Sequence, residues 1–172
     1  EVVNGANSVW ERWDSFTKEH GFDGIGGKNN AAMNSFSHYS FGAVTEWMFR
    51  ELAGIDTDGP GFKKIILRPG PPTPGSNPDH PPIDWVKAEY GSVQGRIVSQ
   101  WKRTHERFEL QATIPANTTA TVFLPAKAAG DIRVNDRPLS QAEGVQYRRM
   151  EGNRAVLAVA PGEYHFTVTL GK

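Results

Sequence analysis

Apolar residues recur at helical spacing in one stretch of the chain, residues 40–54. They fall at positions i, i+3, i+7 and i+11, and they are Phe41, Val44, Met48 and Leu52. This spacing predicts an amphipathic helix. Trp47 and Phe49 widen the apolar stripe, so we expect the helix to be covered on more than one side. Gly54 tolerates a left-handed conformation and marks the expected end of the helix.

The later part of the chain alternates apolar and polar residues with a period of two, which predicts β-strands. The alternation is cleanest at residues 107–114, where Phe108 and Leu110 should face inward. The predicted strands are 62–69, 85–90, 95–103, 107–114, 118–124, 131–134, 147–150, 154–159 and 163–170. Turn residues every 8 to 12 positions are typical of a β-sandwich. We expect the last two strands to form a hairpin across Pro161 and Gly162.

These patterns divide the chain into three regions. Residues 1–56 hold helix-like segments and three of the five tryptophans, with a glycine-rich loop expected at 21–32. Residues 57–84 are a connection rich in proline and glycine that carries one strand, and residues 85–172 are the predicted β-sandwich domain. Two or three helices are too few to enclose a core of their own. We therefore expect the helical region to pack on the sheet or to belong to a larger domain.

Composition excludes several classes of function. Positive and negative side chains balance to a formal net charge of zero, which argues against nucleic-acid or acidic-membrane partners. The chain has no cysteine, and its five histidines lack metal-ligand spacing, so we expect no metal and no cofactor. No apolar run approaches the ~20 residues that span a membrane. The sequence leaves the compartment open among the cytoplasm, the periplasm and the extracellular space.

The first candidate for chemistry is the run 10–15, in which Glu11 lies between two tryptophans, Trp10 and Trp13. Indole rings can tune the proton affinity of a nearby carboxylate, and they can stack on the apolar faces of sugars. Arg12 is the nearest group that could keep the carboxylate ionised. The alternative is a short amphipathic helix with both tryptophans packed inward and Glu11 and Arg12 in water.

The second candidate is His38, which directly precedes the predicted helix. Backbone N–H groups at a helix N-terminus disfavour a charged imidazole, so a neutral His38 could bond to a ligand hydroxyl. The alternative is a helix-capping segment, with Ser37 or Ser40 as the cap and a structural role for the histidine. Aromatic residues of the β region are interpreted as core filling rather than as a sugar-binding surface. They are Trp85, Trp101, Phe108, Phe123, Tyr164 and Phe166.

Several motifs together resemble the bacterial α-L-rhamnosidases of glycoside hydrolase family 78. The resemblance is carried by residues 4–15 (NGANSVWERWDS) and 33–47 (MNSFSHYSFGAVTEW), and it continues through 53–63, 90–101 and 114–122. Ser37 departs from the family pattern, which more often has asparagine before the histidine. The resemblance implies the C-terminal part of a longer enzyme. Residues 1–56 would be the last helices of an (α/α)6 barrel, and an antiparallel β-sandwich would follow.

The resemblance also implies an inverting glycosidase that removes terminal α-L-rhamnose from glycosides. Glu11 would correspond to the general base, and His38, Trp10 and Trp13 to substrate-binding residues. The general acid would lie in sequence that precedes this chain, so we expect the chain to be inactive alone and to self-associate through exposed helix faces. The alternative is a non-catalytic carbohydrate-binding or structural β-sandwich module.

Overall fold

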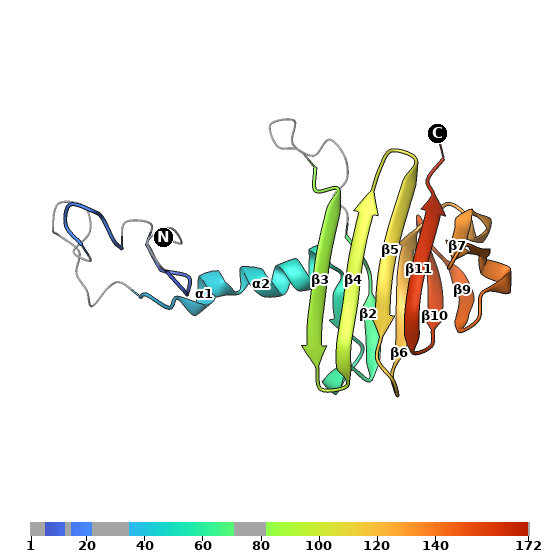
Figure 1. The fold of residues 1–172 in the computed structure, drawn as a ribbon, viewed down its shortest axis with the longest axis horizontal. Helices are drawn as coiled ribbons and strands as arrows, with labels where there is room; N and C mark the ends of the chain where they lie inside the picture. Colours follow the sequence, from blue (N-terminus) through green and yellow to red (C-terminus); the bar gives the residue numbers. More distant parts are fainter. Residues whose placement is uncertain (1–5, 13–14, 22–34, 71–81, 172) are drawn as a thin grey trace. The chain divides into compact units, whose positions relative to one another are not determined.

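The computed structural model describes residues 6–12, 15–21, 35–70 and 82–171 (Figure 1). Residues 1–47 and residues 48–172 are two separate compact units. The loop predicted at 21–32, apart from Gly21, and residues 71–81 of the proline-rich connection lie outside the described residues. None of the helices among the described residues is long and apolar enough to cross a membrane.

The predicted helix at 40–54 is confirmed, but it is divided into short segments. They are α1 (Tyr39–Gly42), α2 (Val44–Trp47) and the π-helical turn η4 (Met48–Leu52). Gly54 follows with φ +74°, the left-handed conformation expected of a residue just beyond a helix. The predicted apolar stripe is largely exposed, since Phe41, Val44 and Met48 each expose about half of their surface.

Two β-sheets follow the helical segment. One sheet has the strand order β1-β2-β6-β10-β9 and the other β3-β4-β5-β11-β7-β8. The strands are β1 (Ile55–Thr57), β2 (Lys64–Leu67), β3 (Trp85–Ser92), β4 (Gly95–Arg103), β5 (Arg107–Ile114), β6 (Thr119–Pro125), β7 (Ile132–Val134), β8 (Arg137–Pro138), β9 (Val145–Glu151), β10 (Arg154–Val159) and β11 (Gly162–Thr169). Short 3-10 turns connect some of them, and they are η5 (Pro60–Phe62), η6 (Ala129–Asp131) and η7 (Leu139–Gln141). Every described strand pair is antiparallel except β2 with β6.

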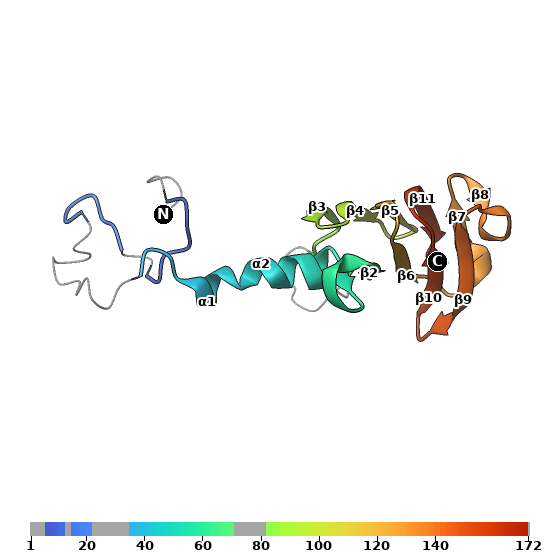
Figure 2. The ribbon, with the colours of Figure 1, turned by 90° about the horizontal axis from the view of Figure 1, so that it is seen from below.

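The sheets form two layers, with β3, β4, β5 and β11 side by side in one of them (Figures 1 and 2). One hydrophobic cluster draws side chains from both sheets, including Phe108 and Phe166 from the larger sheet and Val122 and Leu157 from the smaller. Each of these four side chains is fully buried. This arrangement is consistent with the expected β-sandwich after a helical part, whereas a barrel is not visible among the described residues.

The predicted hairpin between residues 154–159 and 163–170 is wrong. Strand β10 pairs with β6 and β9, whereas β11 pairs with β5 and β7 in the other sheet. The chain crosses from one layer to the other at Ala160, Pro161 and Gly162. The alternation of β11 correctly marks its buried face, whereas β10 buries three consecutive residues, Ala155, Val156 and Leu157. The apolar pattern cannot show whether the two strands belong to one sheet or to two opposed sheets.

Sheet residues satisfy the carbonyl groups at the end of the helical segment. The indole Nε1–H of Trp101 donates to the Leu52 carbonyl at 2.8 Å, and the buried Ser99 hydroxyl donates to the Ala53 carbonyl at 2.6 Å. The Arg68 N–H donates to the Gly54 carbonyl at 2.8 Å. The last carbonyls of a helix lack partners within the helix, so these bonds fix η4 on the larger sheet and on the start of the smaller one.

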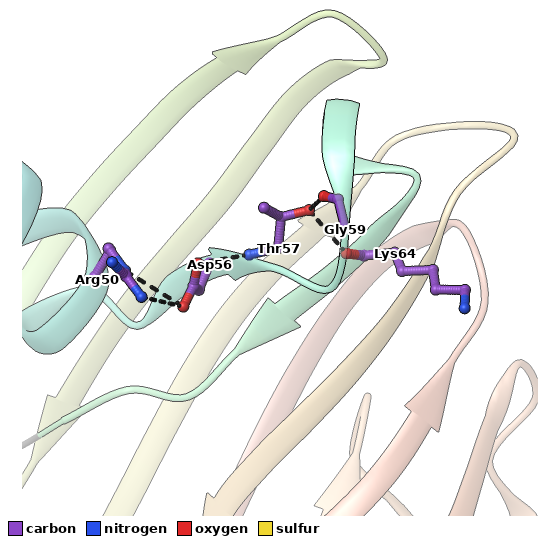
Figure 3. Close-up of polar contacts among 5 residues, drawn as sticks. All are labelled: Arg50, Asp56, Thr57, Gly59 and Lys64. Atoms are coloured by element: carbon purple, nitrogen blue, oxygen red, sulfur yellow. Dashed lines mark hydrogen bonds and ion pairs between the residues drawn. The ribbon is translucent and has the colours of Figure 1, made fainter.

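A cluster of polar contacts surrounds β1 and the turn that follows it (Figure 3). The Arg50 guanidinium contacts the Asp56 carboxylate at 3.1 Å, and the other oxygen of Asp56 accepts the Thr57 N–H at 2.8 Å. The Thr57 hydroxyl donates to the Gly59 carbonyl at 2.6 Å. These bonds order the turn between β1 and β2, which pair with each other, and β1 was not predicted from the sequence.

We expect Ser99→Ala to lower the free energy of unfolding by about 1–3 kcal/mol, because the Ala53 carbonyl would stay buried without its partner. Urea titration of the chain measures the change. Ser140→Ala is the matched control, since Ser140 is exposed on η7, and we expect its effect to stay within about 0.5 kcal/mol. Equal effects of the two substitutions would show that the Ser99 bond does not contribute to stability.

Candidate active site

The two segments that carry the candidate residues lie side by side. The Glu11 N–H donates to the Ser35 carbonyl at 2.8 Å, and the His38 N–H donates to the Val9 carbonyl at 2.7 Å. The Ser8 hydroxyl adds a bond to the Phe36 carbonyl. These hydrogen bonds join residues 24 to 29 positions apart in the sequence, so the backbones that carry Glu11 and His38 are held together.

The Glu11 side chain is partly buried and anchored at one oxygen. Its Oε2 accepts the Ser35 N–H at 2.7 Å, so Ser35 bonds Glu11 through both its carbonyl and its amide. Among the described residues, no other hydrogen bond or ion pair of the Glu11 side chain is found. The second carboxylate oxygen is therefore not committed to any neighbour in the described part of the chain.

The run around Glu11 is not the short helix that the alternative interpretation required. The Glu11 N–H bonds across to Ser35 instead of to its own turn, and Ser15 closes a turn onto the Arg12 carbonyl through its N–H and its hydroxyl. The Trp10 ring meets Phe36 edge to face, with ring centroids 5.3 Å apart. Trp13 lies outside the described residues, so the expected position of Glu11 between two indoles stays a prediction.

His38 occupies the N-cap position of α1, and its side chain makes no capping hydrogen bond. The capping role considered for Ser37 or Ser40 is therefore wrong. The imidazole packs edge to face on Phe41, with ring centroids 4.5 Å apart. The imidazole is held by packing on Phe41 and not by a capping hydrogen bond, so neither ring nitrogen is used to cap the helix. Among the described residues, no three His, Asp or Glu side chains come together as metal ligands.

Two contacts of this site were missed from the sequence. Ser35 and Phe36 belong to the segment that includes His38, but only the histidine was singled out there. Ser35 contributes a backbone amide, which any residue type can supply, so no side-chain signal marks it. Phe36 could have been found as the aromatic residue within two positions of His38.

Two family models match the sequence over adjoining ranges. Residues 1–52 match the bacterial alpha-L-rhamnosidase six-hairpin glycosidase domain, and residues 54–137 match the bacterial alpha-L-rhamnosidase C-terminal domain. The chain belongs to the bacterial α-L-rhamnosidase family. The resemblance drawn from the sequence motifs is thereby confirmed, and the chain corresponds to the C-terminal portion of these proteins.

Individual relatives agree with the family models. The chain is 32% identical over 169 residues to an α-L-rhamnosidase of Streptomyces avermitilis and 29% identical over 165 residues to one of Formosa agariphila. These alignments cover 97% and 96% of this chain, but only 14% and 16% of the relatives. The chain therefore spans about a seventh of the length of these curated relatives.

Solved structures give the same result. The Streptomyces avermitilis α-L-rhamnosidase complexed with L-rhamnose matches with a TM-score of 0.70 and 30% identity, over 98% of this chain and 14% of that one. The α-L-rhamnosidase from Dictyoglumus thermophilum matches with a TM-score of 0.70 and 25% identity, over 98% of this chain and 17% of that one. The similarity thus extends across both compact units of the rhamnosidase-family chain.

Proposed function

We propose that residues 1–172 act as the C-terminal part of a longer inverting glycosidase that removes terminal α-L-rhamnose from glycosides. In this proposal residues 1–56 supply the last helices of an (α/α)6 catalytic domain. Residues 57–84 connect them to a β-sandwich at 85–172 that braces the catalytic domain. The two adjoining family matches and the small share of each relative that the chain spans support this assignment.

Glu11 is the general base of the proposed reaction. An inverting glycosidase needs an acid that protonates the leaving oxygen and, on the opposite face of the sugar, a carboxylate that takes a proton from water as the water attacks C1. The observation that carries the proposal is the anchoring of Glu11 by Ser35 beside the His38 segment. One fixed oxygen orients the carboxylate, and the other can accept the proton of the attacking water.

His38, Trp10 and Trp13 bind the sugar in this proposal. The imidazole, held edge to face against Phe41, bonds a hydroxyl group of the rhamnose ring. The indole of Trp10, held against Phe36, offers an apolar surface to the C–H face of the sugar or to its methyl group. Trp13 is assigned from the sequence motif alone. The general acid comes from another part of the longer enzyme.

The exposed face of the helical segment supports the same proposal. Tyr39, Phe41, Val44 and Trp47 all expose about half of their surface or more. Four large apolar side chains within nine residues form a patch that soluble proteins normally cover. We infer that other helices of the catalytic domain cover this patch, and that the isolated chain self-associates through it.

The isolated chain is expected to show no turnover of 4-nitrophenyl α-L-rhamnoside, because one carboxylate cannot act on both faces of the same sugar. Release of 4-nitrophenol, measured over hours at high protein concentration, gives the rate. Turnover above the buffer background that Glu11→Gln abolishes would contradict the division of acid and base between this chain and the rest of the enzyme.

A further inference from the structure

The outward side chains of the larger sheet form rows that cross β3, β4, β5 and β11, four strands that lie side by side in Figure 1. The middle row consists of Lys87, Gln100, Gln111 and His165. The row next to it consists of Trp85, Lys102, Glu109 and Thr167. All of these residues belong to the unit 48–172, and none of them belongs to the candidate active site.

Two adjoining hollows open on this face. The first, of about 470 Å³, includes Trp85 and Lys87 in its lining, and the second, of about 510 Å³, includes Glu89 and Arg96. Both are also lined by Gln100, Gln111 and His165. The shared residues connect the hollows into one trough, which we call the sheet trough. A trough of this extent has room for more than one sugar ring.

Trp85 departs from the other aromatic residues that were interpreted as core filling. Trp85 is 58% exposed, whereas the rest of that set are buried. Trp85, Lys87 and Glu89 alternate with Val86 and Ala88, so the period of two places Trp85 on the outer face. A large exposed indole beside amide groups suits a ligand that has both an apolar face and hydroxyl groups.

The charges of the sheet trough favour a neutral ligand. Lys87 and Lys102 lie with Glu109 in the first hollow, and Arg96 lies with Glu89 and Glu163 in the second. The Arg96 guanidinium is paired with the Glu89 carboxylate at 3.1 Å. Because both signs occur in each hollow, neither presents the single-sign field that attracts an anion or a cation. The amides of Gln100 and Gln111 and the imidazole of His165 both donate and accept, as sugar hydroxyl groups require.

We propose that the sheet trough binds a neutral oligosaccharide, with one pyranose ring stacked on the indole of Trp85 and its neighbour held by Gln100, Gln111 and His165. This site is separate from Glu11 and carries no chemistry. It holds a glycan on the β-sheet domain, while hydrolysis depends on the other unit and on the rest of the enzyme. The inference does not rest on the proposed role of Glu11.

Calorimetric titration of the 172-residue chain with rutinose, xylohexaose and cellohexaose tests the proposal. We expect at least one of them to bind with a Kd at or below about 1 mM. Trp85→Ala should weaken that binding at least tenfold, and Gln100→Ala should weaken it measurably. Nuclear magnetic resonance gives a second readout, because the bound sugar should shift the side-chain amide signals of Gln100 and Gln111.

Tyr147→Ala is the matched control, since Tyr147 is an exposed aromatic residue on β9 of the other sheet, and its removal should leave the affinity unchanged. His38→Ala, which removes a proposed sugar contact of the candidate active site, should also leave the affinity unchanged, and this separates the sheet trough from that site. Absence of binding by all three sugars would overturn the proposal. So would binding that persists in a folded Trp85→Ala chain, with the fold checked by thermal unfolding.

Discussion

Glu11→Gln is expected to lower kcat for an aryl α-L-rhamnoside by about three orders of magnitude, the usual contribution of a general base. The substitution is made in a chimera in which residues 1–172 replace the matching segment of the Streptomyces avermitilis relative. Glutamine keeps the shape of the side chain and can still accept the Ser35 N–H bond, but it cannot take a proton from water. KM should change little, because substrate contacts are retained.

Glu19→Gln is the matched control for this substitution. Glu19 is an exposed carboxylate in the same unit, 3.9 Å from the ring nitrogen of His20, and the proposal gives it no role. We expect its kcat to stay within about twofold of the parent chimera. A Glu11→Gln enzyme with a near-normal kcat would remove Glu11 from the role of base. An equal loss in both variants would indicate a general effect of lost charge.

Gly54→Ala is expected to lower the free energy of unfolding by about 3–5 kcal/mol, through overpacking and a strained backbone together. A Cβ at this position would lie 2.1 Å from the Arg68 carbonyl carbon and 2.3 Å from the Pro69 nitrogen. These neighbours are backbone atoms of the segment after β2, so they cannot rotate away as a flexible side chain would. Gly54 also adopts φ +74°, which disfavours any residue with a Cβ.

Gly152→Ala separates the two causes. Gly152 also has a positive φ, +58°, but a Cβ there would meet nothing within 4 Å. We expect a loss of about 1 kcal/mol from the backbone conformation alone. Urea denaturation of both variants gives the comparison. If Gly54→Ala were no more destabilising than Gly152→Ala, the close approach of the helix end to the Arg68 segment would not hold in solution.

The spacing of apolar residues predicted those helices and strands whose apolar positions follow one regular period. Residues 107–114 alternate so regularly that both the bounds of β5 and its buried face follow from the sequence. The helix at 40–54 was predicted for the same reason, although its division into short segments was not. Strand β1 was missed, because its three residues are too few to establish a period and lie beside a turn.

Strand pairing was predicted less well than strand position. The pattern of residues 154–170 shows two apolar strands joined by a short turn, which is also the pattern of a hairpin. The choice between one sheet and two depends on contacts with β5 and β6, which are distant in sequence. The same limit applies to the candidate site. Glu11 and His38 were selected from local residue types, but the backbone hydrogen bonds from Glu11 to Ser35 and from His38 to Val9 join residues far apart in the sequence.

Trp85, on the outer face of the larger sheet, was placed incorrectly from the sequence. Trp85 was interpreted as core filling together with the other aromatic residues of the β region, because most of them alternate inward. The alternation of its own strand places it beside Lys87 and Glu89 on the outer face. Trp85 is therefore the exception in that group, and its exposed side chain is the central feature of the sheet trough.

Glu11 is proposed to activate the water that attacks the sugar. Azide rescue of Glu11→Ala in the chimera, with an aryl α-L-rhamnoside as substrate, tests this role. The smaller side chain leaves room for azide, an anion that attacks C1 without needing a base, while the general acid still protonates the leaving group. We expect azide to restore turnover and to give β-L-rhamnosyl azide as the product. Turnover that azide does not change, or a product of retained configuration, would contradict this role.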